Sequence, residues 1–348
     1  MIMLEKSSAT LKGLVTHRVG NKGHEEPLLL SDSESSVPEE SMEYLMTYFL
    51  GAFEAEGFHH FTHPVELELN EVYKLSTKMF AGELSLLDGS QSLAKMLYEH
   101  TNHPKIKPGD FNVAYFENLV LGDEVVDAIG IFKSETNVPF IEMDYQHDHF
   151  SLQHQFGFEL EGMDKGCLVF NTGAAEGYQV LVFDKTNRAL DTKYWFQDFL
   201  ELIPSADEYY NTKEFLKLTK KYVTHGIEKD MDVSKTEKID LLNKSVEYFK
   251  QKDTFDKEEF IESVFEKEEQ KASFHNFQQQ FFAEKKVPVA DAFPISEQAV
   301  KAQSRVFKSV LKLDKNFSVY IHGDKNLIER GNDPDGRKYY KLYFEEEK

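Results

Sequence analysis

The segment FNVAYFENLV, residues 111–120, is followed by VVDAIGIF, residues 125–132, and these two runs decide the fold class. Both are rich in β-branched and aromatic side chains, which favour extended strands. Two similar runs follow, LVFN at 168–171 and GYQVLVFD at 177–184, with Gly, Asn and Asp between them. Short turn-rich connections are typical of antiparallel neighbours, whereas parallel strands need long crossovers. The centre of the chain therefore predicts a mainly antiparallel sheet.

Helical patterns dominate the part of the chain that follows this sheet. Asn211 to Glu214 and Ser234 to Glu237 both have the spacing of a capping box, and each leads into an amphipathic run. A further helix is predicted over about 256–285. The last residues, 307–346, return to short strand-like runs with Gly, Asp and Pro turns between them.

These patterns predict an α+β protein with two lobes. The N-terminal lobe, residues 1–204, is expected to be β-rich and mainly antiparallel. The C-terminal lobe, residues 205–348, is expected to be rich in helices and to end in a small antiparallel sheet. No regular alternation of strand and helix is present, which argues against a doubly wound fold.

The chain of 348 residues carries a formal net charge of -21, and this charge is unevenly distributed. Residues 1–200 hold 14 basic and 32 acidic side chains, whereas residues 295–348 hold 11 basic and 9 acidic ones. An acidic protein does not attract nucleic acid over its whole surface, because phosphate binding needs Lys and Arg. Any contact with phosphate is therefore expected to be local, and the C-terminal segment is the first place to look.

Cysteine usage and hydropathy bear on the compartment. Cys167 is the only cysteine, so no intrachain disulfide forms, which fits a reducing compartment. The N-terminus lacks the basic and apolar regions of a signal peptide, and no run of 18 apolar residues is present. We expect a cytoplasmic protein without a membrane partner, in which Cys167 is a small core residue.

One cluster of ligand-type side chains raises an enzymatic alternative. The segment EMDYQHDHFSLQH, residues 142–154, contains three carboxylates and three imidazoles, which are good metal ligands. The weak candidate ligands are His147, His149 and His154. Their spacing matches no defined metal site, so a polar, solvated strand or loop is the favoured interpretation, and a metal-dependent hydrolase or nuclease is the alternative.

Motifs for nucleophilic catalysis and nucleotide binding are absent from the sequence. No G-x-S-x-G, G-x-G-x-x-G or P-loop pattern occurs, and the glycine-rich stretch 173–177 is typical of a hairpin loop. We predict no catalytic residue and no cofactor.

The C-terminal segment holds the candidate contacts to DNA. Residues 295–342 contain ten basic and six acidic side chains, with Tyr320, Tyr339 and Tyr340 among them. Cations interleaved with aromatic rings suit backbone contact combined with stacking. The candidates are Lys301, Arg305, Lys308, Lys312, Lys315, Arg337, Lys338 and Lys341.

The same segment carries a resemblance to a known family. The stretches VADAFP (289–294), FKSVLKLDKNFSVYIHG (307–323) and KYYKLYFEEE (338–347) resemble the C-terminal region of the NdpA/YejK family of bacterial nucleoid-associated proteins. The order of the N-terminal strands, the helix near Pro38 and KGCLVFNTGAA (165–175) also agrees. The resemblance implies a cytosolic, nucleoid-located protein that associates with DNA and has no catalytic site.

The sequence thus predicts a non-catalytic nucleoid-associated protein. It binds DNA weakly and without strong sequence preference, or a protein partner recruits it to the chromosome. A scaffold that makes no direct DNA contact is the remaining alternative. Other nucleoid proteins and homo-oligomers stay open as partners.

Overall fold

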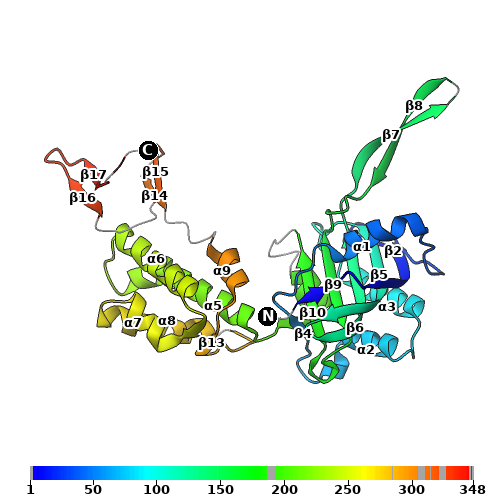
Figure 1. The fold of residues 1–348 in the computed structure, drawn as a ribbon, viewed down its shortest axis with the longest axis horizontal. Coiled ribbons are helices and arrows are strands. Elements are labelled where there is room, and N and C mark those ends of the chain that lie inside the picture. The colour runs from blue at the N-terminus through cyan, green and yellow to red at the C-terminus, as the bar shows by residue number, and fades with distance from the viewer. Residues whose placement is uncertain are drawn as a thin grey trace. The chain divides into compact units, whose positions relative to one another are not determined.

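The chain divides into two compact units, Met1–Ser205 (unit 1) and Ala206–Lys348 (unit 2) (Figure 1). This computed structural model describes residues 3–146, 148–185, 193–283, 285–304, 310–313, 315–320, 327–344 and 346. Each unit has its own hydrophobic core, so each is described by itself.

Unit 1 is built on a nine-stranded sheet in which neighbouring strands run antiparallel, with the order β11-β4-β10-β9-β6-β5-β2-β3 and β1 paired to β5. The predicted α+β class with a mainly antiparallel N-terminal sheet is confirmed. The strands are β1 (Leu4–Glu5), β2 (Thr10–Val19), β3 (Leu28–Leu29), β4 (His59–Phe61), β5 (Gly109–Leu121), β6 (Glu124–Ser134), β9 (Lys165–Phe170), β10 (Gln179–Asp184) and β11 (Leu202–Pro204).

Both faces of this sheet are buried. On β6, Ile129 and Ile131 join one core, whereas Ala128 and Phe132 join the other, because successive side chains of a strand point to opposite faces. Helices α2 (Glu71–Phe80) and α3 (Leu86–Glu99) pack on the first face, together with the π-helical segment Lys193–Phe199. Helix α1 (Met42–Leu50) covers the second face (Figure 1).

Strands β7 (Val138–Gln146) and β8 (His149–Gly157) form a separate two-stranded ribbon, called the arm below. Among the described residues, neither strand pairs with the main sheet. Figure 1 shows the arm projecting away from the body of unit 1. At its base, the buried carboxylate of Asp164 accepts hydrogen bonds from the backbone N–H groups of Glu135 and Thr136, at 2.7 and 2.9 Å. Both ends of the arm are thus tied to the body.

A row of buried charges crosses the sheet beside the base of the arm. Lys133 on β6 lies opposite Lys165 on β9, and Lys165 lies opposite Asp184 on β10. Both lysine side chains are 0% exposed. Glu135 lies between the two ammonium groups, with Nζ–O distances of 3.0 Å to Lys133 and 3.4 Å to Lys165. Tyr194 donates a hydrogen bond to the same carboxylate at 3.2 Å.

These contacts determine how the buried groups titrate. Burial by itself would raise the pKa of Glu135, but the attraction of Lys133 and Lys165 holds that pKa below its ordinary value. Burial lowers the pKa of Lys133 despite its contact with Glu135. A buried ion pair is costly to break, because the remaining charge loses both its partner and water.

Unit 2 packs its helices around an aromatic core. Phe215 lies at its centre, with ring centroids 4.2 Å from Phe255 and 5.3 Å from Phe260. Two short strands, β12 (Thr254–Asp256) and β13 (Ala292–Pro294), pair beside this core. The helices are α5 (Glu208–Lys221), α6 (Lys235–Gln251), α7 (Lys257–Val264), α8 (Glu268–Ala283) and α9 (Glu297–Ser304).

The helix starts of unit 2 agree only in part with the sequence analysis. The capping box at Ser234 and Glu237 is confirmed. The one at Asn211 was wrong, because α5 begins earlier, at an N-cap formed by Asp207. Asn211 instead lies within the helix and accepts a hydrogen bond from the backbone of Ala290 at 3.0 Å. The helix expected over 256–285 is divided into α7 and α8 by a non-helical break.

The C-terminal residues form two hairpins, so the expected antiparallel pairing is present, but as two separate two-stranded sheets instead of one. They are β14 (Val310–Leu313) with β15 (Phe317–Tyr320), and β16 (Ile328–Asn332) with β17 (Lys338–Leu342). Leu313, Val319, Ile328 and Tyr340 pack around Ile239 of α6, which is 8% exposed. The two hairpins are therefore held against one helix by a small apolar contact.

The buried charge row leads to a first prediction. Glu135→Gln should lower the free energy of unfolding by about 3–5 kcal/mol, because two buried ammonium groups lose their shared carboxylate. Chemical denaturation followed by circular dichroism measures this change. The control is Glu117→Gln, which removes a carboxylate from the exposed pair with Lys12 and should change stability by less than about 0.5 kcal/mol. Equal effects of the two substitutions would contradict the account.

A second prediction concerns pH. Because the folded-state pKa of Glu135 lies below its unfolded value, its contribution is present at neutral pH and is lost as pH falls through the folded-state pKa. The stability difference between the wild type and Glu135→Gln should therefore shrink below about pH 4. Denaturation titrations across that range test this, and a constant difference would exclude it.

Candidate nucleic-acid interface

The β16–β17 hairpin has two chemically different faces. In its register, Arg330 lies opposite Tyr340, and Asn332 lies opposite Lys338. These residues share one face with Ile328, because opposite residues of an antiparallel pair and alternate residues of a strand point the same way. Since Ile328 and Tyr340 contact Ile239, this face is the one that turns toward α6.

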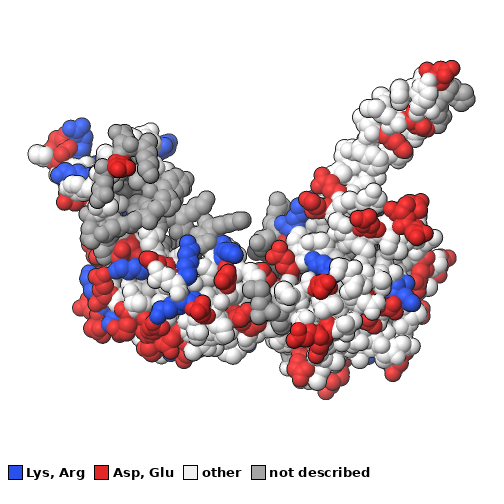
Figure 2. Space-filling view, in the orientation of Figure 1, with Lys and Arg blue, Asp and Glu red and all other residues white. Residues whose placement is uncertain are grey.

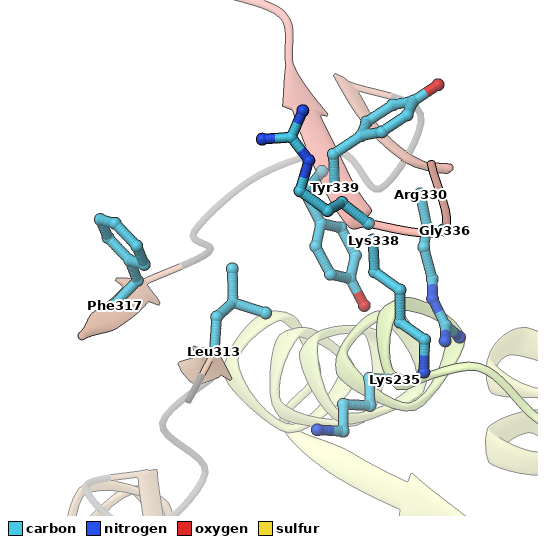
Figure 3. Close-up of a pocket in the computed structure, with 9 residues that line it drawn as sticks. Lys235, Leu313, Phe317, Arg330, Gly336, Lys338 and Tyr339 are labelled. Atoms are coloured by element: carbon cyan, nitrogen blue, oxygen red, sulfur yellow. The ribbon is translucent and has the colours of Figure 1, made fainter. Parts of the chain in front are cut away.

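Between this hairpin, the β14–β15 hairpin and the start of α6 lies a cavity of about 730 Å³. Figure 3 shows the side chains of Arg330 and Lys338 extending from the hairpin toward the helix that carries Lys235. This cavity is called the cationic pocket. Its lining residues are Lys235, Leu313, Phe317, Arg330, Gly336, Arg337, Lys338, Tyr339 and Tyr340.

The described lining of the pocket is positive, because four of these residues are Lys or Arg and none of them is acidic. No described carboxylate forms an ion pair with Lys235, Arg330 or Lys338. The guanidinium of Arg337 pairs with Asp335 at 2.6 Å, so its charge is partly neutralised. The N-terminal end of α6 adds partial positive charge, which Glu237 in its first turn offsets in part.

Aromatic rings complete the pocket. Phe317 is 66% exposed, and Tyr339 and Tyr340 are half-buried. Gly331 lies opposite Tyr339, and a Cβ atom at Gly331 would come within 2.2 Å of that ring. The glycine therefore gives the tyrosine ring room to lie across the hairpin. Exposed cations beside exposed rings can hold a phosphate backbone and stack on a base.

The other predicted cations lie elsewhere. Lys341 is on the opposite face of β17, 3.8 Å from Glu329. Lys301 on α9 is 3.8 Å from Glu297 and lines a second, mixed-charge cavity with Lys250 and Lys252. Lys315 is exposed in the turn that joins β14 and β15.

Three further candidates receive no side-chain description. Lys312 lies on β14, opposite Ser318, and its side chain is outside the described set. Arg305 and Lys308 lie entirely outside the described residues. For these three, direct contact with DNA stays a prediction.

Two cations of the pocket are not among the eight candidate contacts. Arg330 is nevertheless one of the ten basic residues counted in 295–342, so the charge of that segment already indicated it. Lys235 had no such signal, because it is the first residue of a helix about 100 positions earlier in the chain. Only the packing of the hairpins on α6 brings it to the pocket.

The His/Asp segment 142–154 lies on the arm. His149 and His154 are both on β8 but point to opposite faces, because they are five positions apart and successive side chains of a strand alternate. His154 stacks edge-on against Phe156, with ring centroids 4.7 Å apart, and His147 lies outside the described residues. Within the described part of the chain, no three His, Cys, Asp or Glu residues come close enough to hold one metal ion.

Cys167 is fully buried in the core of unit 1, and burial raises the pKa of its thiol. A thiol in that setting is a poor nucleophile, because the thiolate is the reactive form. No described helix is both long and apolar enough to cross a bilayer.

Comparison with known proteins decides the family. The sequence model of the family described as nucleoid-associated protein YejK matches residues 15–340 of the 348. The chain belongs to this family. The resemblance found in the C-terminal segment is thereby confirmed over almost the whole length. No curated protein matches the chain by sequence search.

The family match extends through both units. It includes the arm, the buried charge row and the cationic pocket, whose last lining residue is Tyr340. A nucleoid-associated protein works among DNA and DNA-bound proteins, so a positive pocket on an acidic chain is the first feature to connect with that setting.

The attachment of the hairpins to α6 gives a third prediction. Ile239→Ala should cost about 2 kcal/mol of packing and loosen both hairpins, because Ile239 is their shared buried contact. Hydrogen exchange of the backbone amides of β16 and β17 should become faster, while exchange in unit 1 is unchanged. Glu247→Ala, at an exposed position of the same helix, is the control and should leave both rates unchanged. Unaltered exchange in Ile239→Ala would show that the hairpins are held by other contacts.

Proposed function

We propose that this protein is a non-catalytic nucleoid protein that binds the DNA backbone directly, through the cationic pocket of unit 2. The observation that carries the proposal is the convergence of Lys235, Arg330 and Lys338 on one cavity, whose described lining residues include no Asp or Glu. Phosphate oxygens accept hydrogen bonds from such groups, and each contact releases counterions from the duplex.

The chemistry of the pocket supports binding with little sequence preference. Phosphate contacts hold a protein in register but do not distinguish bases. The exposed ring of Phe317 can stack on any base, since every base has a π-face. Duplex DNA, or duplex with locally opened strands, is the ligand class that fits.

Binding should also be weak and sensitive to salt. The first 200 residues carry 18 more acidic than basic side chains, so most of the chain repels DNA. Figure 2 shows acidic side chains spread over the visible surface of both units. Screening acts over about 8–10 Å near physiological salt, which confines attraction to the immediate surroundings of the pocket. A nucleoid location is part of this proposal and is supported by the family match.

A catalytic role is not part of the proposal. No observation on the described residues favours the metal-dependent hydrolase, since its candidate ligands His149 and His154 point apart. The scaffold without direct DNA contact remains as an outcome of the experiment below.

The test is a DNA-binding titration of the full chain at several salt concentrations. Arg330→Ala/Lys338→Ala should weaken binding to every duplex sequence and lower the slope of log K against log salt by up to about 1.8, since each phosphate contact contributes about 0.9. Fluorescence anisotropy with a labelled duplex measures both quantities.

The matched control is Lys78→Ala/Lys95→Ala, which removes two exposed charges from unit 1 and should leave the slope unchanged. An equal loss in both variants would mean that total charge, rather than the pocket, governs binding. Wild-type protein that binds no duplex even at low salt would overturn the proposal and favour recruitment by a protein partner.

A further inference from the structure

The arm carries an amphipathic pattern that becomes visible only in its strand register. Met143 lies opposite Leu152, and Tyr145 lies opposite Phe150. Alternate residues of each strand share a face, so these four side chains and two others form one surface. The apolar face is defined by the side chains of Ile141, Met143, Tyr145, Phe150, Leu152 and Phe156, and the imidazole of His154, opposite Ile141, lies on the same side of the ribbon.

All six side chains of the apolar face are exposed. Their exposed fractions lie between 60% for Tyr145 and 71% for Met143. The opposite face is mainly polar, because Glu142 lies opposite Gln153 and Asp144 lies opposite Ser151. We call the side with the apolar face the inner side of the ribbon, and the polar side the outer side. No described residue covers the inner side.

An uncovered apolar face on a two-stranded ribbon is physically unfavourable. A hairpin of two strands is at best marginally stable alone in water and needs packing on one face. At this exposure each large side chain offers roughly 100–150 Å², so the face presents on the order of 700 Å². Apolar patches of this size are uncommon on monomers and mark interaction surfaces. The hydrogen bonds of Asp164 join the two segments that flank the arm, so the arm begins at a fixed base in unit 1.

Charge excludes two kinds of occupant. Residues 138–157 contain no Lys or Arg but three carboxylates, at Glu142, Asp144 and Asp148. On the visible side of the arm, Figure 2 shows white and red but no blue. DNA and anionic membrane surfaces both require cations for binding, so neither fits the arm.

A second copy of the same arm does fit. We propose that two chains form a homodimer in which the apolar faces of their arms pack against each other. A twofold axis places the same patch on both sides, so an apolar face is matched with an apolar face. The carboxylates of Glu142 and Asp144 then point outward and do not meet. About 700 Å² from each chain approaches the roughly 800 Å² per partner of a standard stable interface.

The first experiment measures the mass of the full chain in solution. Sedimentation velocity from about 1 to 100 μM should show a dimer for the wild type, because interfaces of this size have dissociation constants of micromolar or tighter. Leu152→Glu should shift the protein to a monomer, because it buries a charge in the apolar contact. Gln153→Glu adds the same charge one residue away on the outer face and should remain dimeric.

The second experiment tests the facing geometry. Cys167 is the only cysteine and is fully buried, so an introduced cysteine is the one accessible thiol. In Leu152→Cys, a bismaleimide that spans about 10 Å, the distance between packed sheets, should link two chains. In Gln153→Cys the thiols lie on outer faces, so linking should be much weaker.

Three results would overturn the proposal. They are a monomeric wild type at the highest concentration, a Leu152→Glu variant that stays dimeric, and equal cross-linking at positions 152 and 153. The circular dichroism spectrum of each variant should match the wild type, since both positions are exposed in the single chain. The inference is independent of DNA binding, so either proposal can fail alone.

Discussion

Glu135 satisfies two lysine ammonium groups that the sheet of unit 1 buries completely, and much of that unit depends on this contact. Lys133 and Lys165 lie directly opposite each other on β6 and β9, where like charges repel. The carboxylate between them joins the ends of two strands to the π-helical segment through Tyr194. Glu135 is also where the chain leaves the sheet toward the arm. The electrostatic balance of the core and the origin of the arm therefore lie at the same place.

Unit 2 combines a strong core with a weak attachment. Its helices are fixed by stacked aromatic rings around Phe215, whereas the hairpins that carry most of the pocket's cations rest on α6 through Ile239 and four partly buried side chains. The pocket therefore depends on a small apolar contact between the hairpins and α6, which is itself part of the helical core. Elements with few buried contacts open most easily, so the hairpins are the part of unit 2 that can move without disturbing the helices.

The two units carry surfaces of different chemistry. Unit 1 offers an apolar face without cations, and unit 2 offers a cationic pocket in which no described lining residue is acidic. A dimer formed through the arms would carry two pockets. Two weak sites on one particle bind a long polyanion more tightly than either site alone, because the second contact forms at a high effective concentration. Weak local attraction on an acidic chain is then compatible with residence on the nucleoid.

Sequence alone determined the features that depend on neighbouring residues. Alternation of β-branched and aromatic residues predicted the antiparallel sheet, and Ser234 with Glu237 predicted a helix start. The local excess of Lys and Arg pointed to the C-terminal segment.

Tertiary structure decided every feature that needs residues distant in the chain to meet. Asn211 has the right spacing for a cap, but α5 is capped by Asp207, and Asn211 lies inside the helix and bonds to Ala290. The segment 142–154 is rich in potential metal ligands, but consecutive residues of a ribbon alternate between its two faces. The strand register separates His149 from His154 and gathers the apolar residues on one side. Lys235 joins Arg330 and Lys338 only through packing on α6. Local propensities act over a few residues, whereas burial and charge pairing act between any groups that the fold brings within contact distance.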